Sequence, residues 1–372
     1  MKIVLFYHAF TSCWNNGNAH FVRGVTRELV KLGHDVALCE PRDGWSRSNA
    51  LKDGPEVLQE TATLVPGVRI EAHNGDPDLD ELLDGADLVI VHEWNPPDLI
   101  AAIGRRRRQG ARFQLLFHDT HHRAVTAPHE VSSFDLSGYD GVLAFGEVLR
   151  EIYLDRGWAQ RVYTWHEAAD VELYHPMPEV HKEWDLVWIG NWGDDERSSE
   201  LMEYLVGPVG RLSLSAQIFG VRYPEHAKAA IAAAGIVYGG WLPNHRAPLA
   251  FAKARATVHV PRAPYARQLA GIPTIRVFEA LACGIPLVSA PWTDAECLFP
   301  SGCYITVSSG EAMAAALGAI QEDVDLAASL VRNGLASIRE RHTCRHRAQE
   351  LLAIAHDIAL PASGRQRDRI AS

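Results

Sequence analysis

The sequence predicts an α/β protein built from two Rossmann-like domains that face a central cleft. Short apolar runs alternate with amphipathic segments along the whole chain, which is typical of parallel sheets covered by helices. A proline-containing stretch near residues 174–184 interrupts this rhythm, and the same alternation restarts after it. The length of 372 residues fits two domains of ordinary size.

The N-terminal half begins with a β–α–β unit. Residues 2–7 form an apolar run rich in strand-forming side chains, and residues 20–32 carry apolar side chains at helical spacing before Gly33. Residues 35–39 supply the next strand, so the first sheet is expected to be parallel. Later strands are expected at 86–91, 113–117 and 141–144, and the less regular segment 43–85 is expected to hold a helix and an edge strand.

The C-terminal half repeats this order, with a strand at 184–190, a polar loop and a helix at 197–206. Further strands are expected at 215–219, 235–238, 256–260 and 285–289. Further helices are expected at 226–234, 247–253, 275–283, 311–320, 324–341 and 345–358. We therefore expect an N-terminal domain over 1–174, a C-terminal domain over 175–344, a last helix over 345–360 that crosses back to the first domain, and a flexible tail over 361–372.

The composition excludes several classes of protein. The net charge is −10 and the one tight basic run is 105–108, so non-specific nucleic-acid binding is not expected. This run favours a solvated helix face, with at most peripheral contact to an acidic membrane. The chain has no membrane-spanning apolar stretch, and its N-terminus continues as a strand. Six scattered cysteines fit free thiols, so we expect a cytoplasmic protein of undefined oligomeric state.

The most informative segment is GIPTIRVFEALACGIPLVSA, residues 271–290. Thr274 is expected to be the N-cap of a short helix over 275–283, with its hydroxyl accepting a hydrogen bond from a free N–H one turn on. Gly284 is expected to end that helix in a left-handed conformation, and the next strand follows directly.

The start of this helix suits a phosphate group. The free N–H groups around Ile275 carry partial positive charge, and Arg276 in the first turn can add a bidentate clamp. Glu279 lies on the same face one turn further, where a carboxylate can accept both hydrogen bonds of a ribose diol. These features fit a nucleotide diphosphate, although the same spacing also fits a surface Arg–Glu pair on an ordinary helix.

A second candidate phosphate site follows the strand at 184–190. Gly190 and Asn191 begin a loop in which a glycine turn lets the backbone approach a phosphate closely. Arg197, at the start of the next helix, can reach a diphosphate oxygen. Alternatively, the acidic residues at 194–196 cap that helix and Arg197 points to solvent.

Two clusters of polar residues also follow predicted strands. The loop Asn16-Gly17-Asn18 has a single glycine and lacks the GxGxxG fingerprint, which disfavours an NAD-dependent dehydrogenase. It can equally be a polar cap of the first helix. The run HDTHH over 118–122 lies where α/β enzymes place ligands. Adjacent residues at a strand end point in opposite directions, so these side chains cannot all converge on one ion, and no metal site is predicted.

Several segments, in order, resemble the GT-B glycosyltransferases of the glycosyltransferase-4 type, and most nearly their CgeB-like (spore maturation protein) branch. The segments are KIVLFYHAF…NGNAHFVRGVTRELVKLGHDVAL, FQLLFHDTHH, ADVELYHP, DLVWIGNWGDDERSSEL, YGGWLP, RVFEALACGIPLV and HTCRHRAQELL. The resemblance covers nearly the whole chain. It implies a bacterial-type, metal-independent and retaining glycosyltransferase that uses a nucleotide-diphosphate sugar, with UDP as the expected nucleotide, no other cofactor, and an unknown acceptor.

The resemblance also implies which residues form the site. The implied donor-binding residues are Gly190, Asn191, Arg197, Gly240, Trp241, Leu242, Thr274, Ile275, Arg276 and Glu279. The implied acceptor or phosphate loop is Asn16, Gly17 and Asn18. The implied catalytic residues are His118, Asp119 and His20, of which the histidines have the near-neutral pKa that suits proton transfer.

The chain departs from this family pattern at one position. Many relatives carry a Glu eight positions before the Glu matched by Glu279, and here that position is Gly271. In those relatives the carboxylate sits beside the donor sugar, so its absence leaves the sugar and the stereochemical course open. If the reaction inverts, Asp119 or His20 is the candidate base. A nucleotide-sugar epimerase of the same fold and a non-catalytic nucleotide-sugar-binding protein remain alternatives.

Overall fold

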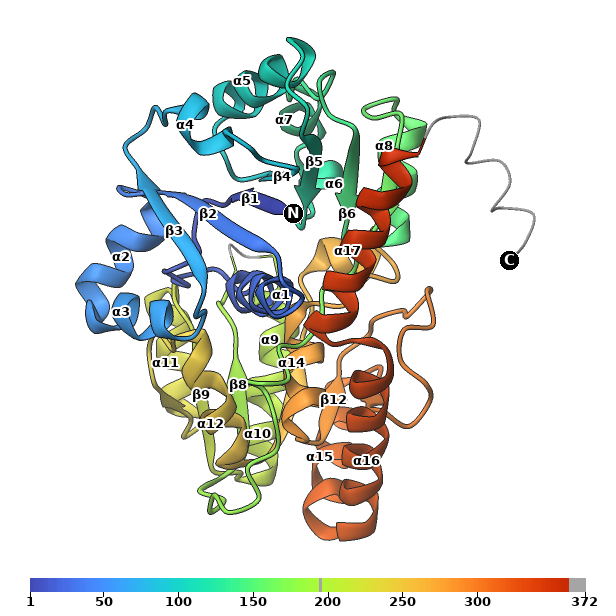
Figure 1. Cartoon of the computed structure of the whole chain (residues 1–372). Coiled ribbons are helices and arrows are strands. Elements are labelled where there is room, and N and C mark those ends of the chain that lie inside the picture. Colours follow the sequence, from blue (N-terminus) through green and yellow to red (C-terminus); the bar gives the residue numbers. More distant parts are fainter. Residues whose placement is uncertain (194–195, 361–372) are drawn as a thin grey trace.

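A computed structural model describes residues 1–193 and 196–360 (Figure 1). These residues form a seven-stranded sheet of order β3-β2-β1-β4-β5-β6-β7 and a six-stranded sheet of order β10-β9-β8-β11-β12-β13. Every pair of neighbouring strands is parallel. The two parallel sheets confirm the predicted fold class. The expected tail 361–372 lies outside the described residues.

The first sheet and its connections confirm the β–α–β start. Its strands are β1 (Lys2–Phe6), β2 (Asp35–Pro41), β3 (Val68–His73), β4 (Leu88–His92), β5 (Gln114–Asp119), β6 (Gly141–Ala144) and β7 (Val162–Thr164). Its helices are α1 (Ala19–Lys31), α2 (Trp45–Asp53), α3 (Glu56–Thr63), α4 (Leu79–Leu83), α5 (Pro97–Arg108), α6 (Arg123–Thr126), α7 (Pro128–Ser132) and α8 (Glu147–Asp155). The segment 43–85 holds the edge strand β3, as predicted, but three helices instead of one.

The second sheet follows the predicted order of elements. Its strands are β8 (Trp184–Ile189), β9 (Ala216–Phe219), β10 (Val237–Tyr238), β11 (Ala254–His259), β12 (Leu287–Ser289) and β13 (Ile305–Thr306). Its helical segments are α9 (Ser198–Leu201), the π-helix η1 (Met202–Val206), α10 (Gly207–Leu212), α11 (Glu225–Ala233), the 3-10 helix η2 (Asn244–Arg246), α12 (Ala247–Ala252), α13 (Ala263–Arg267), α14 (Ile275–Cys283), α15 (Gly310–Glu322) and α16 (Val324–Arg341). The helix predicted over 197–206 therefore contains a π segment. Pro208 follows it and lacks an N–H for regular helical hydrogen bonding.

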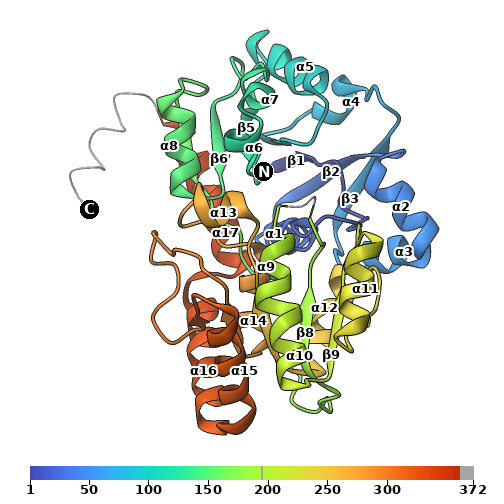
Figure 2. The same ribbon diagram turned by 180° about the vertical axis from the view of Figure 1, so that it is seen from behind.

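Helices cover both faces of each sheet, as the two opposite views show (Figures 1 and 2). The central strands β4 and β5 are accordingly apolar and buried on both faces. The first sheet occupies the upper part of Figure 1 and the second sheet the lower part. Within the described part of the chain, no helix combines the length and the apolar character that crossing a membrane requires.

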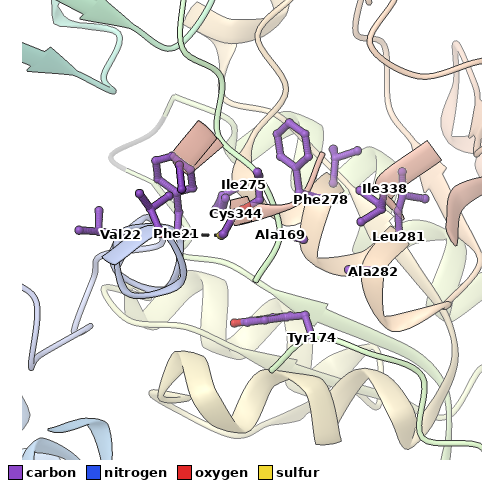
Figure 3. Packing of buried hydrophobic residues seen from close by; sticks show 14 of the residues in the cluster. Phe21, Val22, Ala169, Tyr174, Ile275, Phe278, Leu281, Ala282, Ile338 and Cys344 are labelled. Atoms are coloured by element: carbon purple, nitrogen blue, oxygen red, sulfur yellow. Dashed lines mark hydrogen bonds between the residues drawn. The ribbon is translucent and has the colours of Figure 1, made fainter. Parts of the chain in front are cut away.

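One hydrophobic cluster joins the two halves (Figure 3). Phe21 on α1 and Phe278 on α14 are both fully buried in it. The Cys344 thiol donates a hydrogen bond to the Phe21 carbonyl at 3.6 Å. Gly24 permits this close approach, because a Cβ at that position would lie 2.5 Å from the Cys344 sulfur. Separating the two sheets would therefore expose part of a shared core.

The last helix, α17 (Cys344–Ala359), returns to the first half of the molecule, as expected. It packs against α1 and β5, on the opposite face of the first sheet from α8 (Figure 1). The Trp165 indole N–H donates to the Arg347 carbonyl at 2.9 Å, and the Gln114 side-chain amide donates to the Ala355 carbonyl at 2.7 Å. These bonds fix α17 on the first sheet, although the chain reaches it only after completing the second.

The basic run at 105–108 forms the last turn of α5. Arg106 pairs with Asp80, Arg107 pairs with Asp140 at 3.1 Å, and Arg108 pairs with Asp135 at 3.4 Å. Three of the four charges are thus matched by carboxylates on neighbouring segments. This agrees with the predicted solvated helix face.

Candidate active site

A cavity of about 810 Å³ lies between the two sheets. Residues at the carboxyl ends of β1, β2, β4 and β5 line it from the first half, and residues at the ends of β8, β9 and β11 line it from the second. Ligands of parallel α/β proteins bind at this edge of the sheet. The predicted cleft is therefore present, and both sheets contribute to it.

The loop Asn16-Gly17-Asn18 lines the cavity and is hydrogen-bonded to the second half of the chain. The Asn244 side-chain amide donates to the carbonyls of Asn16 at 3.0 Å and Gly17 at 3.2 Å. A Cβ on Gly17 would lie 3.0 Å from the Ile275 side chain, so a larger residue would press on the start of α14. The predicted loop thus lies directly against the predicted phosphate-binding helix.

Helix α14 has the predicted bounds, Ile275–Cys283, and Gly284 ends it with φ +65°. Thr274 occupies the N-cap position, but its side chain makes no capping hydrogen bond, so that part of the prediction is wrong. Thr274, Ile275 and Arg276 all line the cavity. The start of the helix therefore forms part of the cavity wall without a side chain capping it, which is suited to an anion.

Glu279 lies directly behind this wall. It is fully buried, forms an ion pair with Arg276, and its Oε1 lies 2.9 Å from Nδ1 of His20. Burial by itself would raise the pKa of Glu279, but Arg276 and His20 outweigh it and hold that pKa below its ordinary value. Glu279 is therefore ionised at neutral pH, and it is not itself among the residues that line the cavity.

Among the described residues, four arginines line the cavity, and all belong to the second half of the chain. They are Arg197, Arg222, Arg262 and Arg276. The sequence reasoning identified the first and last but missed the other two, which each follow a predicted strand by two or three residues. Such a concentration of guanidinium groups is suited to a diphosphate, because each can donate two parallel hydrogen bonds to its oxygens.

Arg197 is the most deeply buried of these arginines, with 8% of its surface exposed. Its guanidinium donates to the carbonyl of Val260 at 2.7 Å and to that of Asn191, while its Nε has no partner. Burial, together with the nearby charge of Arg262, lowers the pKa of Arg197 to about 9. The side chain points into the structure and not to solvent, which contradicts the exposed position considered for it; the capping role considered for residues 194 and 195 lies outside the described residues. Gly190 and Asn191 also line the cavity.

The loop after β10 contributes Trp241 and Leu242 to the cavity but not Gly240. Gly240 has φ +68°, and its carbonyl accepts a hydrogen bond from Gly220 at 2.8 Å. Gly240 itself is therefore not among the residues that line the cavity. Its left-handed backbone shapes the turn that presents the next two side chains.

The structure does not bring the three predicted catalytic residues to the cavity. His118 is fully buried against Tyr7 and Trp165, with its ring 4.8 Å from the latter. Asp119 is also buried and accepts a hydrogen bond from the Tyr153 hydroxyl at 2.6 Å. Both belong to the last residues of β5, and their side chains are enclosed by the elements that pack on the sheet. Neither residue is among those that line the cavity.

His20 is likewise enclosed. Its ring lies 4.5 Å from that of Tyr174, and its Nδ1 faces Glu279. His20 belongs to α1, faces Glu279 of α14, and is not among the residues that line the cavity. In this position, His20 helps to hold Glu279 in its ionised form.

Other residues of the first half line the cavity in place of the three predicted catalytic residues. Thr120, His121 and His122 follow β5 directly and line the cavity. Glu167 lines it from the segment after β7, with one carboxylate oxygen that has no partner. Burial, and secondarily the charge of Glu279, raises the pKa of Glu167 well above its ordinary value. The short β7 gave no sequence signal that could have found Glu167.

Comparisons with known proteins agree with this geometry. Residues 197–353 match the family described as glycosyl transferase-like. Sucrose-phosphate synthase from Thermosynechococcus elongatus is 16% identical, with 96% of this chain and 99% of that chain covered and a TM-score of 0.68. Anabaena HepE, solved with UDP and glucose, is 14% identical, with 97% and 100% covered and a TM-score of 0.67. The chain has the GT-B fold.

A more distant GT-B structure is T4 phage BGT in complex with its UDP-glucose substrate. It is 12% identical, with 97% of this chain and 100% of that chain covered and a TM-score of 0.61. No curated protein sequence matches at a significant level. The family match and the fold together support a glycosyltransferase, and they do not favour the epimerase alternative.

Proposed function

We propose that this protein transfers a sugar from a nucleotide-diphosphate sugar, with UDP as the nucleotide, to an acceptor held by the N-terminal half of the cavity. The observation that carries the proposal is the group of four arginines around the uncapped start of α14. HepE and T4 phage BGT, which share the fold, have both been solved with UDP-glucose or its parts. The order of sequence motifs further supports a CgeB-like, glycosyltransferase-4-type enzyme of the bacterial cytoplasm.

The donor would lie along the second half of the cavity. Arg197 and Arg276 bind the diphosphate, with the first-turn N–H groups of α14 completing its hydrogen bonds. As the diphosphate draws the Arg276 guanidinium towards itself, the Glu279 carboxylate becomes free to accept hydrogen bonds from the ribose. One movement of a side chain therefore prepares both contacts. The base lies against Trp241 and Leu242.

The reaction breaks the bond between the sugar and the diphosphate, so negative charge develops on the leaving oxygen. Arginine side chains and helix N–H groups that already face this oxygen stabilise the transition state, and one such donor contributes about 3 kcal/mol. Because these cations are supplied by the protein, we propose that the transfer is metal-independent. We also propose retention, with the departing diphosphate accepting the proton of the attacking hydroxyl.

Isothermal titration calorimetry with UDP, GDP, ADP, CMP and dTDP tests the donor assignment. We expect UDP to bind most tightly, and an Arg276→Met variant to lose most of that affinity. Arg345→Met is the matched control, because Arg345 is exposed and lies outside the cavity. Equal affinity of the Arg276 variant and the wild type would contradict the assignment. Proton NMR of the product anomer, once a transfer product is obtained, tests retention.

A further inference from the structure

The two halves of the cavity differ sharply in charge. All four arginines that line it come from the second half, whereas none of the described lining residues from the first half is Lys or Arg. A phosphate-bearing acceptor, such as a nucleic acid or a phospholipid, would therefore meet no cation among these lining residues, and Arg123, which lies behind Trp94, is already paired with Glu93 and Glu130. From this contrast and the side chains described next, we propose that the acceptor is an uncharged saccharide that lies across Trp45 and Trp94. This inference rests on the proposed transferase function.

Trp45 and Trp94 are unusual in being large aromatic side chains left open at the cavity. Trp45 is 57% exposed and Trp94 is 43% exposed, and both line the cavity. Indole rings offer broad apolar faces, and the ring C–H groups of a sugar form an apolar face of similar size. An exposed tryptophan in a cavity is therefore suited to a saccharide.

Both indoles are braced by neighbouring residues. Trp14 packs edge-on against Trp45, with ring centroids 4.8 Å apart, and its own indole N–H donates to Asp53 at 2.6 Å. The Arg123 guanidinium lies 4.1 Å from the centre of the Trp94 ring and is itself held by Glu93 at 2.8 Å. Each ring is thus fixed before a ligand arrives, which lowers the entropy cost of binding.

Histidines on the same side of the cavity, two of them in ring contact with Trp94, supply unused hydrogen-bonding groups. His8, His73 and His121 line the cavity, and each has a buried ring nitrogen without a partner. Burial lowers the pKa of His8 to about 4 and that of His121 to about 2, and it also lowers that of His73. The imidazoles are therefore uncharged at neutral pH, and each can donate one hydrogen bond and accept another. Sugar hydroxyls, which do both, are their natural complement.

The combination of exposed indole rings and uncharged imidazoles favours a saccharide over other uncharged acceptors. A purely aromatic acceptor would stack on the indoles but would leave the imidazole nitrogens without partners, at a cost. A serine side chain would reach one imidazole and leave both indoles uncovered. A saccharide of two or more units satisfies both kinds of group at once.

The test begins with wild-type protein saturated with UDP. Calorimetry is performed with maltotetraose, cellotetraose and chitotetraose, and then with a duplex oligodeoxynucleotide and a serine-containing peptide. We expect at least one neutral saccharide to bind. Trp45→Ala and Trp94→Ala should each weaken the binding of that saccharide roughly tenfold in Kd, the change that about 1.4 kcal/mol produces. Trp45→Phe should recover part of the loss, and Leu51→Ala, exposed on the same helix but outside the cavity, should change nothing.

Transfer from UDP-glucose is then measured with the free saccharide and with the same saccharide carried on a lipid. Transfer to either supports the proposal, and a preference identifies the source of the acceptor. If UDP binds but no saccharide binds, or if only the duplex or the peptide accepts sugar, the saccharide proposal is overturned while the transferase function stands. If UDP itself does not bind the wild type, the proposed function fails first.

Discussion

Replacing Arg197 by Met distinguishes two effects of this buried charge: the free energy by which it destabilises the folded protein and its contribution to binding the diphosphate. The pKa of Arg197 is lowered from 12.5 to about 9, which corresponds to roughly 5 kcal/mol by which burial disfavours its charged form. Because the side chain is charged at pH 7 in both the folded and the unfolded protein, this free energy opposes folding. The substitution removes that cost but leaves the carbonyls of Val260 and Asn191 without a donor, at about 1–3 kcal/mol each.

These two effects are of similar size, so the free energy of unfolding of the ligand-free Arg197→Met protein should differ from that of the wild type by less than about 3 kcal/mol. Ligand binding should change far more. Removing one partner of a buried charge pair costs about 2–5 kcal/mol, so the Kd for UDP should rise by roughly 30-fold or more.

Urea unfolding with and without UDP measures both quantities. At a UDP concentration of about 100 times the wild-type Kd, the wild type should gain about 2.7 kcal/mol. A variant with a Kd about 100-fold higher would gain only about 0.4 kcal/mol at the same concentration. Arg211→Met is the control, because Arg211 is exposed on α10 outside the cavity. If Arg197→Met gained as much from UDP as the wild type, the diphosphate site would have to lie elsewhere.

Three further predictions concern the same site. Since burial raises the pKa of Glu167, the contribution of this group to the unfolding free energy should fall as pH rises above about 4.5. In urea titrations, Glu167→Gln should therefore gain stability relative to the wild type between pH 5 and pH 8. If the difference between the two proteins does not change with pH, Glu167 is ionised in the folded protein. Dialysis against EDTA should leave the rate of sugar transfer unaltered, and restoration by Mn²⁺ after a loss would contradict metal independence. Gly271→Glu should not recreate the family carboxylate but destabilise the fold by more than about 1 kcal/mol, because φ is +94° and a Cβ would lie 2.8 Å from Glu296. Gly210→Ala, with open space around it, should be neutral or stabilising in the same measurement.

The order of elements and the start of α14 could be predicted from the sequence because both depend on local patterns. Alternating apolar runs gave the parallel sheets, and the Thr274 to Gly284 segment gave the bounds of the helix. The spacing of Arg276 and Glu279 within one turn also follows from helix geometry alone. What the spacing could not show is that Glu279 is buried and that its ion-pair partner Arg276 lines the cavity while Glu279 does not.

Only the tertiary structure decided which polar residues face the cavity. His118 and His121 are three residues apart, yet one is enclosed by Tyr7 and Trp165 and the other lines the cavity, because the enclosing side chains come from distant parts of the chain. The four arginines are likewise brought together only when strands β8, β9 and β11 lie side by side. A local pattern fixes a helix or a strand, whereas burial depends on neighbours that the folded chain supplies from elsewhere.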